Sequence, residues 1–188
     1  MKKLLLLLVL FPAFVYAQDA SKKSLLPSSE ISMLYDRKGA IKTETYVILN
    51  DFELLVTKAI IVTDMETKET KGGIELQSFM ITDSGSHPVK YYAKLDIDEI
   101  DKCMEMLVYF QENIADTPAD SVQSQYSYNS RCGATIGVAT DHKAWTVYVK
   151  PVSESAGSHV FLKIEDLPAL IDVFKTAKNI LFEKNPSF

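Results

Sequence analysis

Histidines are the residues of this chain best suited to metal binding or proton transfer, and the sequence holds three of them, His87, His142 and His159. A zinc site needs three or four converging ligands. No other histidine, cysteine or carboxylate lies at ligand spacing on the same predicted element as any of the three. We therefore predict no metal site, and the sequence gives no motif for a cofactor.

Two of these histidines follow a serine, in Ser86-His87 and Ser158-His159. Adjacent residues of an extended chain point to opposite sides, so neither pair forms a nucleophile with its own base. We predict that the protein has no catalytic residue and is not an enzyme. The alternative is a small hydrolase or metal-dependent enzyme, in which His87 and His159 meet carboxylates at the interface of two folded units.

Acidic residues cluster over residues 96–101 and again at Glu165-Asp166. Each cluster comes directly before a stretch of helical period, and carboxylates in the first turn of a helix are stabilised by its dipole. A calcium loop would need spaced Asp or Asn residues around a central glycine, which neither cluster has. We interpret both clusters as helix starts.

The two cysteines, Cys103 and Cys132, lie in a chain that we expect to be exported, and exported proteins usually meet an oxidising environment. Cys103 falls on the apolar stripe of a predicted helix, and Cys132 has the core-facing parity of the next predicted strand. We expect a disulfide between them, worth about 3–4 kcal/mol in the chain-entropy model. The alternatives are two buried thiols or a reactive cysteine.

Aromatic residues on predicted strands are the main indication of a binding surface. Alternation along the strand over residues 144–150 places Trp145, Val147 and Val149 on one face and Tyr148 on the other. Rings that remain outside the core can stack on a glycan, a peptide or a protein. The candidate ligand-binding residues are Tyr126, Tyr128, Trp145 and Tyr148.

The elements that must position these residues include two amphipathic helices, predicted over residues 98–113 and 165–182. The apolar stripe of the first consists of Ile100, Cys103, Met104, Leu107, Phe110 and Ile114. The stripe of the second consists of Leu167, Leu170, Ile171, Phe174, Ala177 and Leu181. Both helices should therefore lie on a hydrophobic core.

Runs of β-branched and aromatic residues, separated by turn residues, precede each helix. In the first half, the predicted strands cover residues 31–35, 41–49, 52–63, 73–82 and 89–95. In the second half, they cover residues 125–129, 132–140, 144–150 and 159–164. We predict that both sets form antiparallel meanders.

The predicted fold class is thus α+β, with antiparallel meanders each followed by one long amphipathic helix. The shared order of the two halves predicts a tandem duplication with a pseudo-twofold arrangement, and one larger curved sheet is the alternative. The predicted parts are a signal peptide at 1–17, a flexible leader at 18–30, a first unit at 31–116, a linker at 117–124 and a second unit at 125–188.

Residues 1–17 have the pattern of a cleaved secretion signal, with two lysines, an apolar run and a small residue at Ala17. The apolar run is too short to span a bilayer, so we predict no stable membrane insertion and a periplasmic or secreted protein. The net charge of −5 disfavours phosphate backbones, so we predict no nucleic-acid partner. An unknown protein, peptide or glycan remains as partner.

The order of strands followed by a helix with an acidic start at Glu165-Asp166 resembles the Whirly and transcriptional-coactivator class of single-strand-DNA-binding folds. The resemblance covers element order, and it implies a β-meander-plus-helix fold. No single strand has the basic, aromatic-interleaved pattern with which those proteins bind nucleic acid, so fold alone is carried over. The chain also resembles small exported bacterial proteins of unknown function.

These observations together predict an exported, non-enzymatic binding or interaction protein. Besides the enzyme alternative given above, a third hypothesis is a structural partner in a cell-envelope assembly that uses a free strand edge for β-augmentation. An unpaired first strand at 31–35 would support that third hypothesis.

Overall fold

The structure is a computed structural model, and it describes residues 28–80, 88–119, 124–140, 143–185 and 188. The predicted signal peptide lies outside the described residues, as do residues 18–27 of the predicted leader and residues 120–123 of the predicted linker. His87 and His142 also lie outside them.

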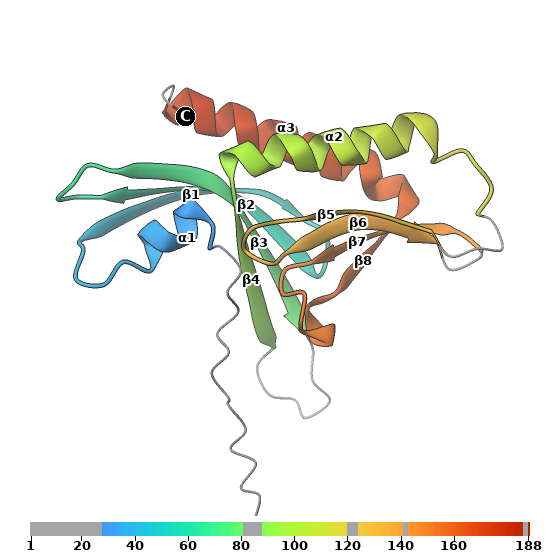
Figure 1. Ribbon diagram of the computed structural model, residues 1–188, viewed down its shortest axis with the longest axis horizontal. Coiled ribbons are helices and arrows are strands. Elements are labelled where there is room, and N and C mark those ends of the chain that lie inside the picture. Colours follow the sequence, from blue (N-terminus) through green and yellow to red (C-terminus); the bar gives the residue numbers. More distant parts are fainter. Residues whose placement is uncertain (1–27, 81–87, 120–123, 141–142, 186–187) are drawn as a thin grey trace, which may run out of the picture.

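The first half of the described chain forms a four-stranded antiparallel sheet in the order β1-β2-β3-β4. Its strands are β1 (Lys42–Asp51), β2 (Leu55–Asp64), β3 (Thr70–Met80) and β4 (Val89–Asp96). Side chains alternate between its two faces, so apolar residues can pack against other elements on each side of the sheet. The inner face is covered by two long helices, and a short helix lies on the outer face (Figure 1).

That short helix, α1 (Glu30–Tyr35), occupies the segment for which we predicted a first strand at 31–35, and this prediction is wrong. The Ser29 hydroxyl caps the helix by accepting a hydrogen bond from the Ser32 amide at 3.2 Å. Ile31 and Leu34 then fall on one helical face and are buried against β2. Five residues are too few for the apolar period to distinguish a strand from a helix.

The second sheet is also antiparallel, in the order β5-β6-β7-β8. Its strands are β5 (Gln125–Asn129), β6 (Thr135–Thr140), β7 (Trp145–Lys150) and β8 (Val160–Lys163). The long helix α2 (Ile97–Asn113) precedes it, and α3 (Leu167–Lys184) follows it. The short 3-10 helices η1 (Ala156–Ser158) and η2 (Ile164–Asp166) flank β8. The predictions of an α+β fold and of antiparallel meanders are confirmed.

The strand that we predicted over residues 132–140 begins later, at Thr135. Cys132 and Gly133 form the preceding turn, in which Gly133 has φ 84°. Because glycine adopts this left-handed conformation without steric cost, the turn interrupts the strand pattern. Cys132 is therefore not on the core-facing side of a strand, as predicted, but in a half-buried turn.

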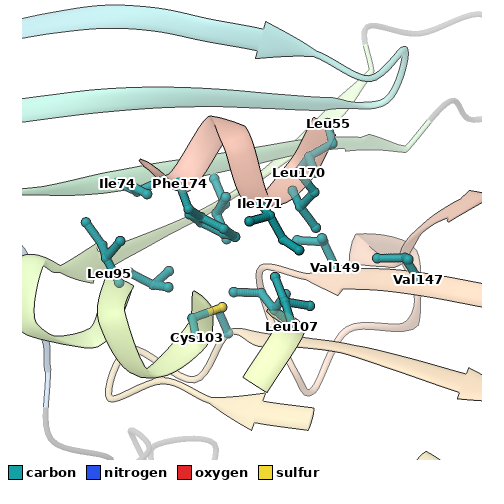
Figure 2. Packing of buried hydrophobic residues seen from close by; sticks show 14 of the residues in the cluster. Leu55, Ile74, Leu95, Cys103, Leu107, Val147, Val149, Leu170, Ile171 and Phe174 are labelled. Atoms are coloured by element: carbon teal, nitrogen blue, oxygen red, sulfur yellow. The ribbon is translucent and has the colours of Figure 1, made fainter. Parts of the chain in front are cut away.

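The two long helices lie side by side across both sheets (Figure 1). Although α3 follows the second sheet in the chain, it packs mainly on β1, β2 and β3 of the first sheet, while α2 contacts both sheets. One hydrophobic cluster joins all of these elements, and Figure 2 shows Leu95, Cys103, Leu107, Leu170 and Phe174 converging in it. The two halves therefore share one core.

The predicted helical stripes are the residues that enter this core. All six residues of the second stripe are buried, as are four of the first, and Met104 and Ile114 pack partly buried against them. Within the described residues, no helix is long and apolar enough to cross a membrane.

The turn between β2 and β3 is held by Asp64, which accepts a hydrogen bond from Arg37 at 2.7 Å and others from the amides of Glu66 at 2.9 Å and Thr67 at 3.1 Å. These donors lower the pKa of Asp64 from 3.8 to about 2, with the Thr67 amide as the largest cause. The carboxylate therefore contributes stability at neutral pH that is lost as the pH falls from about 4 toward about 2.

We expect Asp64→Asn to lower the free energy of unfolding at pH 7 and to have little effect on it in acid. The free energy of unfolding should differ between the two proteins at pH 7, and the difference should shrink as the pH falls from about 4 toward about 2. Urea unfolding at a series of pH values measures it. A difference that stays constant down to about pH 2.5 would show that the Asp64 carboxylate is not held in this way.

Candidate functional site

The outer face of the second sheet carries a shallow groove of about 380 Å³, which we call the Tyr148 groove. Its walls combine rings with uncharged polar groups. They include Gln125, Ser127, Asn129, Tyr148, His159 and Phe161. These residues come from β5, β7 and β8 and from the position just before β8, and residues of β6 line the groove as well, so it depends on the pairing of all four strands.

Strand alternation places these side chains outside. Val147 and Val149 are fully buried under the helices, so Tyr148, between them on β7, points to the opposite face. Thr135 and Ala139 of β6 line the floor of the groove, with Gly137 between them.

Gly137 makes room for the Tyr148 side chain. A Cβ atom at this position would lie 2.3 Å from the Tyr126 carbonyl oxygen and 2.8 Å from the Tyr148 hydroxyl. Both distances are shorter than van der Waals contact, so a larger residue would displace the tyrosine or the neighbouring strand. Glycine is thus required for the observed position of Tyr148 across β6.

The Tyr148 hydroxyl is fixed by Gln125, whose side-chain amide donates a hydrogen bond to it at 2.5 Å. Burial raises the pKa of Tyr148, and its contacts with Ser127 and Gln125 oppose this only in part. The phenol is therefore neutral at physiological pH and keeps its proton for donation to a ligand.

His159 stands at one end of the groove, with its ring 5.9 Å from that of Phe161 in an edge-to-face arrangement. Burial, and after it the nearby Lys150, lowers the pKa of His159 below 6.5. The imidazole is neutral at pH 7, which leaves Lys150 as the charged residue among those that line the groove. The Tyr148 groove can therefore bind a ligand through ring stacking and through hydrogen bonds with uncharged side chains.

The structure separates Tyr148 from two other predicted binding residues, Tyr126 and Trp145. These two face the helices, with their rings 5.7 Å and 4.9 Å from that of Phe110. The Trp145 indole also donates a hydrogen bond to the Thr117 carbonyl at 3.1 Å, which ties the end of the first half to β7. A binding role for these two residues stays a prediction. Their rings pack at the edge of the hydrophobic core, against Phe110.

Tyr128, the fourth predicted binding residue, also faces inward and donates a hydrogen bond from its hydroxyl to Glu99 at 3.1 Å. Burial, and after it the charge of Glu99, raises its pKa.

Both cysteines are free thiols in the structure. Burial raises the pKa of Cys103 and of Cys132, so neither is an activated nucleophile.

The predicted acidic start of the first helix is a structural junction. Asp96 accepts hydrogen bonds from the amides of Glu30 at 2.8 Å and Ile31 at 2.9 Å, which attach α1 to the start of α2. Arg131, from the turn before β6, contacts Asp96 at 2.8 Å and also pairs with Asp98. These carboxylates connect three elements, and each is already occupied by a donor.

A metal site does not form in the part of the chain that the structure describes, since no three His, Cys, Asp or Glu residues converge there. His159 is the one histidine inside that part, and no carboxylate lines the groove beside it. Ser158 is buried, and its hydroxyl donates a hydrogen bond to the Val152 carbonyl of the preceding loop at 2.7 Å. Ser158 therefore has a structural role in the loop and does not act as a nucleophile beside His159.

Sequence reasoning missed a second surface, on the outer face of the first sheet, where lysines lie over aromatic rings. Lys58 lies 5.4 Å from the Tyr46 ring centroid, and Lys94 lies 4.1 Å from that of Tyr35. Both lysines also contact the buried Glu75, at 2.9 Å and 3.3 Å. Because the residues come from different strands and α1, only the register between strands reveals the cluster. The shared carboxylate offsets much of its charge, so we regard it as structural.

Comparisons with family models, curated proteins and solved structures found no match to this chain. They therefore indicate no enzyme family.

Proposed function

We propose that this protein is an exported, non-enzymatic binding protein that holds a neutral, hydroxyl-rich ligand such as a glycan in the Tyr148 groove. The observation that carries the proposal is the combination, in one open depression, of exposed rings with hydrogen-bonding side chains that are uncharged except for Lys150. Such a surface offers recognition without the paired titratable groups that acid–base chemistry needs.

The rings suit the apolar faces of sugars. Phe161 is 66% exposed, so its ring is available for stacking without any rearrangement. Beside it, Gln125 and Asn129 carry both donors and acceptors, and the neutral Tyr148 hydroxyl adds another. A hydroxyl-rich ligand can pair with these groups without bringing a charge that must be desolvated.

Export is the second part of the proposal, and it is supported by the two lysines and the apolar run within residues 1–17.

The third part is the tandem duplication. It is supported by the same strand order in the two sheets and by the placement of a helix of 17 residues after the first and of 18 residues after the second. The packing of α3 on the first sheet suits a pseudo-twofold exchange of helices.

The enzyme alternative requires His159 to meet a carboxylate and a second histidine. Its groove has no carboxylate among the lining residues, and His87 lies outside the described part of the chain. The envelope-assembly alternative requires a free strand edge. Among the residues that the structure describes, β1 has one, although the predicted strand at 31–35 does not.

The test is a binding screen against immobilised neutral oligosaccharides of the gluco-, xylo- and manno- series, followed by calorimetry on any that binds. We expect Tyr148→Ala to weaken binding at least about tenfold, because it removes a ring and a hydroxyl from the groove. Tyr109→Ala is the matched control, since Tyr109 is an exposed ring on α2 and should leave binding unchanged. Binding that survives Tyr148→Ala, or a screen without any binder, would refute a glycan groove at this site.

A further inference from the structure

The first strand of the first sheet leaves one edge open. β1 pairs with β2 on one side, with regular register from Lys42 to Ile48 and a bulge between Ile48 and Asn50. Within the described residues, no strand pairs with its other side. A free edge presents a row of backbone donors and acceptors that can pair with another chain.

The centre of this edge lacks the features that usually protect an exposed strand. Tyr46, Val47 and Ile48 are 56%, 37% and 61% exposed, so apolar groups project from both faces of the strand. The run from Thr45 to Asn50 holds no charge, no proline and no glycine. Soluble proteins commonly place a lysine, a proline or a bulge within such a run. Here the bulge comes only at its far end.

We propose that this edge pairs antiparallel with β1 of a second copy of the chain, which joins two four-stranded sheets into one continuous sheet. A twofold axis perpendicular to the sheet keeps each face on its own side, so residues of the same parity meet across the new pair. The strand must therefore complement itself, and its sequence can be tested for a register that does so.

A register centred on Val47 satisfies this requirement. With the axis at Val47, this valine meets its own copy on the inner face, and Tyr46 of each copy meets Ile48 of the other on the outer face. An aromatic ring opposite a β-branched residue is a favourable cross-strand pair. Lys42 and Glu44 then fall outside the apolar centre. An axis at Thr43 would instead pair these two charges and leave the exposed Tyr46 and Ile48 uncovered.

A second copy is favoured over an unrelated partner because the apolar centre is complementary to itself. The net charge of −5 makes two copies of the chain repel each other, but Lys42 and Glu44 of β1 lie away from the centre of the proposed pair. The Tyr148 groove is on the other sheet, so the proposed dimer and the proposed glycan site are independent of each other, and evidence against one does not count against the other.

Light scattering after size exclusion tests the dimer, with protein purified from cells that express the full chain. We expect a mass near twice that of one chain at micromolar concentration. The double variant Tyr46→Lys, Ile48→Lys places lysines opposite one another, and we expect the dimer dissociation constant to rise at least about tenfold. Both positions are exposed, but Tyr46 lies under Lys58 and Ile48 lies opposite Lys58 in the sheet, so circular dichroism and urea unfolding must show that the double variant keeps its fold before its dissociation constant is compared.

The control Tyr109→Lys, Phe161→Lys adds the same charge at exposed rings away from β1 and should remain a dimer. The register is tested by Val47→Cys, which should form a disulfide-linked dimer on oxidation, whereas Thr43→Cys should not, with the unaltered chain as background for Cys103 and Cys132. A monomer at all concentrations, including one whose edge is covered by its own residues 1–27, would overturn the proposal. A dimer that survives the double variant would overturn it as well.

Discussion

Phe174→Ala is expected to lower the free energy of unfolding by about 3–5 kcal/mol, the range typical of deleting a buried ring. Phe174 is fully buried on α3. Figure 2 shows it in the core beside Ile171 and Leu170, with Ile74 of β3 and Leu95 of β4 in the same cluster. Its loss would open a cavity at the place where the helix of one half meets the sheet of the other.

Chemical denaturation measures this effect, and Phe182→Ala is the matched control. Phe182 lies two turns further along the same helix and is 37% exposed, so its removal should cost far less. A loss below about 1 kcal/mol for Phe174→Ala would contradict the packing of α3 on the first sheet. A loss equal to that of Phe182→Ala would show that burial does not distinguish the two positions.

The helices could be predicted from the sequence because their signal is local. The apolar stripe that contains Leu170 and Phe174 needs only the 3.6-residue period, and the acidic residues before it mark where the helix starts. The core positions followed from the same pattern. What the pattern does not contain is the partner surface, so the packing of α3 on the first sheet required the structure.

The candidate site was predictable only in part. Alternation along β7 correctly separates Tyr148 from Trp145, because parity is fixed within one strand. The grouping of Tyr148 with Gln125 and Phe161 depends on register between strands, which no single segment encodes. The same limit hid the lysine-and-ring cluster around Glu75 on the first sheet.

The errors at residues 31–35 and at Cys132 have a common cause. In both places a short local signal outweighs an apolar pattern. Ser29 caps a helix where β-branched and aromatic residues suggested a strand, and Gly133 forms a turn where the alternation suggested that the strand continued. Capping and left-handed turns act over three or four residues, whereas periodicity needs a longer window to be decisive.

Glu99→Ala is expected to cost about 3 kcal/mol, because it removes the acceptor shared by several buried donors. Glu99 is 2% exposed and receives hydrogen bonds from the Arg131 amide at 2.7 Å, the Asp96 amide at 3.0 Å and the Tyr128 hydroxyl at 3.1 Å. These donors belong to three segments, so Glu99 joins the start of α2 to the second sheet.

The readout combines denaturant unfolding with a spectroscopic titration of tyrosine. Burial raises the pKa of Tyr128, and the charge and hydrogen bond of Glu99 raise it further, so the variant should ionise this phenol at lower pH than the unaltered protein does. Glu105→Ala, an exposed position on the same helix, should change the stability by less than about 0.5 kcal/mol and leave the tyrosine titration unaltered. If Glu99→Ala destabilised the protein no more than this control, Arg131 would be held by Asp96 and Asp98 alone. The second sheet would then be attached to α2 through its apolar contacts, without a buried polar connection.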